Sequence, residues 1–164
     1  MLIRRGFKFE LKPNGMQIQL MKQFCGCARY VYNRTLSLEK SLYKKDSKHS
    51  FKYTEAANRL PEWKKKNPFL KECHSQVLQQ SLKDLDQAYT NFFRKQANFP
   101  RYKKKFQHDS IRFPQGVELD EVKQQIRVPK IGWMGYRKSR DIIGTIKNVT
   151  VSRRGEKWDV SIQT

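Results

Sequence analysis

At Phe99-Pro100-Arg101-Tyr102-Lys103-Lys104-Lys105, the apolar residues of the chain change from one spacing to another. Before this stretch they recur every three or four positions, as on one face of a helix. After Pro100 they fall in short alternating runs. Gly, Pro, Asp and Asn separate those runs, which is typical of strands joined by turns. We therefore predict an α+β protein in which a helical segment precedes several strands.

The first residues predict one strand and one long helix. Apolar side chains such as Phe7 and Phe9 alternate with polar ones over residues 2–12, which is typical of a half-buried strand. Asn14 followed by Gln17 is a capping pair that can begin a helix. One apolar face continues from there to Leu42.

Two further helices are expected before the change of pattern. Thr54 is the expected N-cap of a short helix over residues 55–60, and the proline-bracketed, lysine-rich residues 61–68 are expected to form a loop. Ser75 is the expected N-cap of a third helix, whose wide apolar stripe extends to about Asn98.

The C-terminal part predicts a small β-barrel. The expected strands cover residues 110–113, 117–119, 125–128, 143–152 and 157–162, with a hairpin turn at 153–156. The strand over residues 2–12 has no partner unless it joins these strands. The helical segment would then be an insertion into a β-barrel.

The charge of the chain points to a polyanionic partner. Thirty-five Lys and Arg residues oppose fifteen Asp and Glu residues, which gives a net charge of +20 over 164 residues. Neither a membrane-spanning run nor a signal peptide is apparent in the sequence. We therefore expect a cytoplasmic, nucleoid-associated protein with no membrane partner.

The sequence offers no recognisable catalytic or metal-binding set. A metal-dependent nuclease needs carboxylates that converge from different elements, and the acids here are scattered. Cys25 and Cys27, with Cys73 and His74, could in principle form a zinc site, but a one-residue gap on a helix turns the two thiols to different faces. We therefore interpret the cysteines as small buried residues and predict no metal site, no cofactor and no catalytic residue.

Two basic segments are candidate contacts with RNA phosphates. Arg101, Tyr102, Lys103, Lys104 and Lys105 combine cations, which neutralise phosphates, with an aromatic ring that can stack on an unpaired base or pack beneath.

The second candidate segment comprises Arg137, Lys138 and Arg140, beside Trp133 and Tyr136. Its structural alternative is a basic hairpin tip with the aromatic residues in the core.

Six short motifs follow one another over nearly the whole chain: LKPN (11–14), ARYVYN (28–33), LQQSLKDL (78–85) with AY (88–89) and NFF (91–93), FPRYKK (99–104), VPKIG (128–132) and KNVTV (147–151). In this order they resemble the TnpB (OrfB) proteins of bacterial insertion sequences, which are RNA-guided nucleases related to type V CRISPR effectors.

This resemblance implies a wedge domain, which is a small β-barrel of the oligonucleotide-binding type, over residues 1–12 and 99–164. A helical recognition domain over residues 13–98 would interrupt it. The chain ends where the family would begin its RuvC nuclease domain, so the resemblance implies no cleavage by this chain alone. The divalent metal of the family would belong to that missing domain.

The resemblance also implies two nucleic-acid partners, a guide RNA and a short flanking motif in double-stranded target DNA. The residues expected at the DNA are Tyr53, Ser75, Gln79 and Lys83. The amide of Gln79 can bond both N6 and N7 of adenine in the major groove.

Two alternatives remain open at this stage. The chain could be a sequence-specific transposase or repressor fragment that binds DNA without RNA, with residues 75–98 as its recognition helix. It could also be a fragment of a complete enzyme, which a longer reading frame carrying a strand with Asp would reveal. The sequence predicts no oligomeric state.

Overall fold

The computed structural model describes residues 3–164, which form two compact units. The sheet unit comprises the chain up to Cys25 together with His108–Thr164, and the helical unit comprises Gly26–Gln107. Met1 and Leu2, which belong to the expected first strand, lie outside the described residues. The assignment of these units to a wedge domain and a recognition domain stays a prediction.

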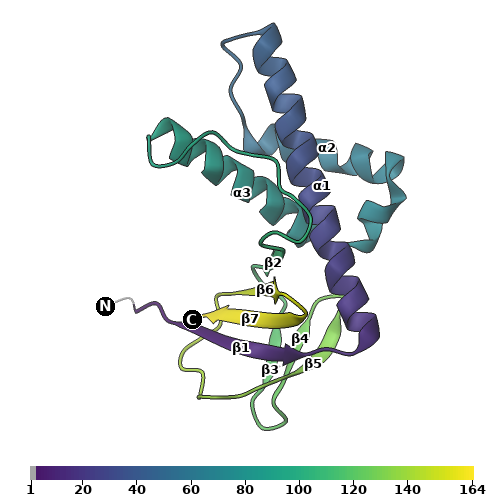
Figure 1. Ribbon diagram of the computed structural model, residues 1–164, viewed down its shortest axis with the longest axis vertical. Coiled ribbons are helices and arrows are strands. Elements are labelled where there is room, and N and C mark those ends of the chain that lie inside the picture. Colours follow the sequence, from purple (N-terminus) through teal and green to yellow (C-terminus); the bar gives the residue numbers. More distant parts are fainter. Residues whose placement is uncertain (1–2) are drawn as a thin grey trace. The chain divides into compact units, whose positions relative to one another are not determined.

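The sheet unit is built on a seven-stranded antiparallel sheet within the described residues (Figure 1). The strand order is β2-β6-β7-β1-β5-β4-β3. Their bounds are β1 Gly6–Lys12, β2 Ser110–Phe113, β3 Glu118–Asp120, β4 Gln125–Val128, β5 Gly132–Tyr136, β6 Asn148–Arg154 and β7 Lys157–Gln163. Together with the helices, this sheet confirms the α+β class.

Strand β1 joins the later strands, as the sequence predicts. Its first part, Gly6 to Glu10, pairs with β7, whereas Leu11 and Lys12 pair with β5. The edge strands β2 and β3 do not pair with each other over residues 3–164, so the described sheet is not closed. The closed barrel therefore stays a proposal.

The start of helix α1 (Gly15–Lys45) is tied to the sheet by its capping pair. Asn14 N donates to Gln17 Oε1 at 3.0 Å, and Gln17 N donates to Asn14 Oδ1 at 2.8 Å, which confirms the predicted capping box. The buried Gln17 amide also donates to the backbone carbonyl of Trp133 at 2.8 Å. One local motif thus begins the helix and attaches it to β5.

The helical unit contains most of α1, together with α2 (Tyr53–Lys66), the 3₁₀ helix η1 (Pro68–Glu72) and α3 (Ser75–Phe93). Part of its core is the buried cluster of Tyr32, Leu36 and Leu85. Phe51 and Tyr89 pack against that cluster with their rings stacked at 5.3 Å. None of the helices over residues 3–164 combines the length and the apolar character that a membrane span requires.

The prediction of a short helix ending before Pro61 is wrong. Helix α2 continues through Pro61 to Lys66, and its N-cap is Lys52 rather than Thr54. Proline inside a helix costs about 3 kcal/mol, but α2 buries Ala56, Leu60 and Trp63 on one face. Burying a side chain of the size of phenylalanine contributes about 1.5 to 3 kcal/mol. Trp63 follows the proline and is buried, so its packing offsets the proline.

Other boundaries also differ from the predictions. The third helix ends at Phe93 rather than near Asn98, and Lys95 lies just beyond with a φ of 60°. The expected strand over 143–152 is regular only from Asn148, after Gly144 at φ 98°. Strand β5 was not predicted, because two of its five residues are glycines, which are depleted in strands.

Candidate nucleic-acid interface

The predicted basic segment 101–105 is held to helix α1 through its backbone. Asn33 Nδ2 donates to the carbonyl oxygen of Lys103 at 2.9 Å, and Lys103 N donates to Asn33 Oδ1 at 2.7 Å. These two bonds satisfy both backbone polar groups of Lys103 with one side chain. The middle of the segment therefore has a defined position within the helical unit.

Aromatic rings lie beneath several cations of this segment and its neighbours. Lys103 Nζ lies 4.4 Å from the ring centroid of the buried Tyr32. Lys40 Nζ lies 4.4 Å from the ring of Tyr102 and 5.6 Å from the ring of Phe99. These distances fall within the range of cation–π contacts. The ring of Tyr102 thus contacts Lys40 of α1. It also remains accessible, because Tyr102 keeps 46% of its surface exposed.

The cations of the segment are not neutralised by acids of the same chain. Arg101, Lys103, Lys104 and Lys105 are all exposed. Within residues 3–164 none of them forms an ion pair with Asp or Glu. Four adjacent positive groups of this kind can release counterions from a phosphate backbone.

The second predicted segment has a different environment. Arg140 Nη2 donates to the carbonyl of Gly6 at 2.8 Å, and its guanidinium carbon lies 4.6 Å from the Phe7 ring centroid. Lys138 Nζ lies 2.9 Å from Asp141 Oδ1 and 3.4 Å from Glu121 Oε2.

The hydrogen bond to Asp141 raises the pKa of Lys138 above its usual value. Arg137 lies 3.9 Å from Glu10 Oε2. These three cations thus have partners within the sheet unit, and their contact with RNA stays a prediction.

The predicted DNA-facing residues lie along one stripe of α3. Ser75, Gln79 and Lys83 are spaced four residues apart and are all exposed. Lys83 Nζ lies 5.7 Å from the ring centroid of Tyr53, at the start of α2. Lys64 Nζ lies 3.3 Å from Ser75 Oγ, near the end of α2. Helices α2 and α3 are therefore antiparallel here, and the structure brings the predicted residues together along their seam.

The rest of α3 leaves little surface for insertion into a groove. Its buried residues are Val77, Leu78, Gln80, Ser81, Leu82 and Leu85. Ser81 Oγ also donates to the carbonyl oxygen of Ala28 in α1, at 2.6 Å. Only one stripe of the first half of α3 is therefore exposed, which disfavours its use as a conventional recognition helix.

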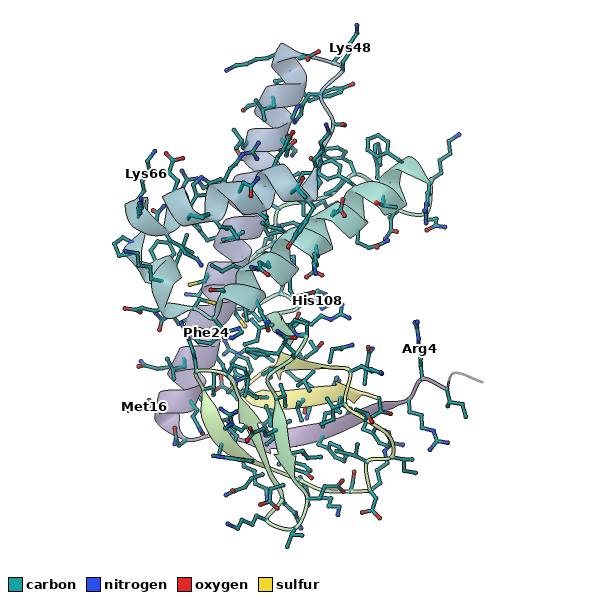
Figure 2. The ribbon with its side chains drawn as sticks, turned by 180° about the vertical axis from the view of Figure 1, so that it is seen from behind. Arg4, Met16, Phe24, Lys48, Lys66 and His108 are labelled. Atoms are coloured by element: carbon teal, nitrogen blue, oxygen red, sulfur yellow. The ribbon has the colours of Figure 1, made fainter. Side chains whose placement is uncertain are left out.

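Sequence reasoning missed three residues of these surfaces. Asn33 is part of the ARYVYN motif, but its partner Lys103 is seventy residues away. Lys40 was not singled out in the sequence, and Lys64 belonged to the lysine-rich loop expected over residues 61–68. Residues 64–66 form the last turn of α2 rather than a loop, and Lys66 points outward from its end (Figure 2).

The cysteines are buried, as predicted, and all three are free thiols. A side-chain hydrogen bond with Cys73 lowers the pKa of the Cys27 thiol. No group of three His, Cys, Asp or Glu residues in the described part of the chain could hold a metal ion.

Comparison with known proteins relates the chain to one group. Residues 1–48 match the family HTH_OrfB_IS605, described as a helix-turn-helix domain. Over residues 3–48 the structure has one strand and one long helix instead of two helices joined by a turn.

Two curated relatives are also similar to the chain. It is 49% identical over 162 residues to a protein of Escherichia coli (strain K12) named as a candidate RNA-guided DNA endonuclease, InsQ. It is 38% identical over 104 residues to a candidate RNA-guided DNA endonuclease of Streptomyces pristinaespiralis. The matches cover 98% and 62% of this chain, but only 40% and 25% of the two relatives.

Proposed function

This chain is a relative of the TnpB/OrfB-type proteins of insertion sequences, and from that premise we propose that it is their nucleic-acid-binding portion. In this proposal it binds a guide RNA and, with that RNA, a short flanking motif in duplex DNA. The sheet unit acts as a wedge domain derived from an oligonucleotide-binding barrel. The helical unit acts as the recognition domain.

The observation that carries the proposal is the environment of residues 101–105. Their cations are exposed and without acidic partners in the described chain, and Asn33 fixes the backbone of Lys103. An arrangement of this kind suits a phosphate backbone, because little reorganisation is needed before the contacts form. Arg137, Lys138 and Arg140 are proposed as a weaker contact, because each would have to leave or share its present partner.

The α3 stripe supports the DNA side of the proposal. Gln79 offers an amide that can bond adenine, and Lys83 and Lys64 add positive charge on either side of it. Ser75 and Tyr53 complete the surface. A shallow stripe of this kind suits a short motif rather than an extended site.

We further propose that this chain alone does not cleave DNA. The chain spans two fifths of the length of its curated relative from E. coli, whose name assigns it an endonuclease activity. Cleavage with a divalent metal would be supplied by sequence that this chain does not include.

The proposal is tested by what the chain carries from its own host. We would purify the full chain at moderate salt from cells that contain its insertion sequence and then sequence the bound nucleic acid. One discrete RNA transcribed from the end of the element is expected. Heterogeneous nucleic acid, or duplex DNA that survives ribonuclease treatment, would overturn the proposal and favour direct DNA binding without RNA.

A further inference from the structure

A groove on the helical unit shares only Asn33 with the surfaces described above. It is formed by α1 and η1, and its lining residues are Gly26, Arg29, Tyr30, Asn33, Arg34 and Phe69. Two of these are arginines, two are aromatic and none is acidic. Two arginines without an acidic residue repel a cation, and their N–H groups need a ligand that offers hydrogen-bond acceptors.

The aromatic side of the groove is partly open. Phe69 keeps 42% of its surface exposed, although its ring meets the ring of Tyr30 edge to face, with centroids 5.2 Å apart. A phenylalanine that is exposed to this extent, in a groove that also contains arginines, offers a flat apolar surface of the size of a nucleobase. Stacking of bases on such rings is a general mode of single-strand recognition.

Arg34 has a fixed guanidinium group. Its Nη1 donates to Tyr30 Oη at 2.8 Å, and its guanidinium carbon lies 4.5 Å from the ring centroid of the buried Trp63. Because these contacts use one N–H and one face of the group, Arg34 is held in place by neutral partners. A planar guanidinium held in this way is suited to a phosphate oxygen.

Gly26 lies within the 31-residue helix α1 and lines the groove. Glycine there costs about 1 kcal/mol in helix stability relative to alanine. A Cβ at this position would meet only Arg29 Nη2, at 3.6 Å. Arg29 thus lies across a position without a side chain, and the missing side chain leaves room in the groove.

From these contacts we infer that the groove binds one unpaired nucleotide of a single-stranded nucleic acid. The base stacks on Phe69 beside Tyr30, and the phosphate contacts Arg29 and Arg34. A base within a duplex is already stacked on both faces and does not enter. The inference rests on the proposed binding of RNA, but it assigns a site distinct from residues 101–105. Asn33, which lines the groove, also holds Lys103, so one strand can contact both.

The test compares two variants of the full chain by fluorescence anisotropy, using a labelled twelve-nucleotide oligo(U), the matching oligo(dT) and a twelve-base-pair duplex. Phe69→Ala removes the stacking surface, and Gly26→Leu fills the groove with a good helix former while leaving every charge in place. Each variant is expected to bind the single strands about tenfold more weakly, the usual effect of losing one stacked base. Binding of the duplex is expected to stay unchanged.

Three controls make the result specific. Phe93→Ala removes a more exposed aromatic residue outside the groove and is expected to bind like the parent chain. Phe69→Trp keeps a stacking surface and is expected to restore binding. The salt dependence of Phe69→Ala should match that of the parent chain, because stacking releases no counterions.

The failure of this inference is distinguishable from the failure of the proposed function. If the parent chain binds neither single strand, RNA binding itself is wrong. If the parent chain binds but Phe69→Ala and Gly26→Leu bind equally well, the groove is not the site. Loss for oligo(U) alone assigns the groove to RNA, and equal loss for oligo(dT) assigns it to single strands in general; both support the inference.

Discussion

The side chain of Asn33 and the backbone of Lys103 form a closed pair of hydrogen bonds, at 2.9 Å and 2.7 Å, across seventy residues of sequence. The amide of asparagine has the same donor and acceptor as a peptide group, so Asn33 acts like a neighbouring strand for a single residue. The lysine-rich segment is thereby positioned without regular secondary structure of its own.

Replacing Asn33 by Ala is expected to release the segment. Both hydrogen bonds are lost, at about 0.5 to 1.5 kcal/mol each for exposed neutral groups. The amide of Lys103 should then exchange with solvent faster, and the affinity for single-stranded RNA should fall. Hydrogen exchange followed by mass spectrometry measures the first effect. Asn58→Ala, at an exposed position of α2, is the control; equal protection of Lys103 in both variants would contradict the prediction.

The sequence predicted local features more reliably than distant ones. The capping box of Asn14 and Gln17 involves three residues of separation, and it is present as predicted. The hairpin turn predicted at 153–156 is also present, and it too depends only on residues that are close in the sequence. Gly155, at φ 62°, is the first central residue of the turn between Arg154 and Lys157.

Predictions failed where tertiary packing outweighed a local rule. Pro61 normally ends a helix, but α2 continues past it and buries Trp63. Strand β5 was missed because its glycines hide the alternation of Met134 and Tyr136, both of which are buried. The groove beside Arg34 could not be predicted, since Phe69 comes from a distant turn of 3₁₀ helix.

Glu39 is expected to be the most sensitive charged residue of the helical unit. Its buried carboxylate contacts His49 Nε2 at 2.5 Å and Arg59 Nη1 at 3.2 Å, which links α1, the following loop and α2. Glu39→Gln keeps the shape but removes the charge, so the free energy of unfolding should fall by about 1 to 3 kcal/mol. Urea unfolding followed by tryptophan fluorescence measures this change.

Glu62→Gln provides the matched control for that measurement. Glu62 pairs with Lys66 at 3.0 Å on the exposed surface of α2, four residues apart. A surface pair of this kind contributes about 0.3 to 0.5 kcal/mol. Equal effects of the two substitutions would show that Glu39 has no special role.

Tyr89 is expected to make the helical unit sensitive to alkali. Burial, with smaller contributions from Glu39 and other tyrosines, raises the pKa of Tyr89 to about 12. In the unfolded chain the pKa of tyrosine is about 10. Folding therefore favours the neutral form of Tyr89. The contribution of Tyr89 to the free energy of unfolding is fully present below pH 10 and is lost as the pH rises toward 12.

Tyr89→Phe isolates this effect from the titration of the lysines. The difference in free energy of unfolding between the parent chain and the variant should stay constant up to about pH 10 and then shift against the parent chain toward pH 12. Urea titrations at several pH values measure it. A difference that stays constant across this range would show that Tyr89 titrates alike in both states.

Tyr136 carries a buried hydroxyl group that has no hydrogen-bond partner among the described residues. Its ring packs beside Phe9 with centroids 5.2 Å apart, so the ring stabilises the sheet while the hydroxyl carries a desolvation cost. Tyr136→Phe removes only that hydroxyl and should leave the free energy of unfolding unchanged or raise it by about 1 kcal/mol. Tyr136→Ala also removes the ring and should cost about 3 to 5 kcal/mol, as for other large aromatic residues in cores. Urea unfolding of both variants, followed by tryptophan fluorescence, separates the two contributions. Destabilisation of the Phe variant by more than 1 kcal/mol would mean that the hydroxyl is hydrogen-bonded in solution.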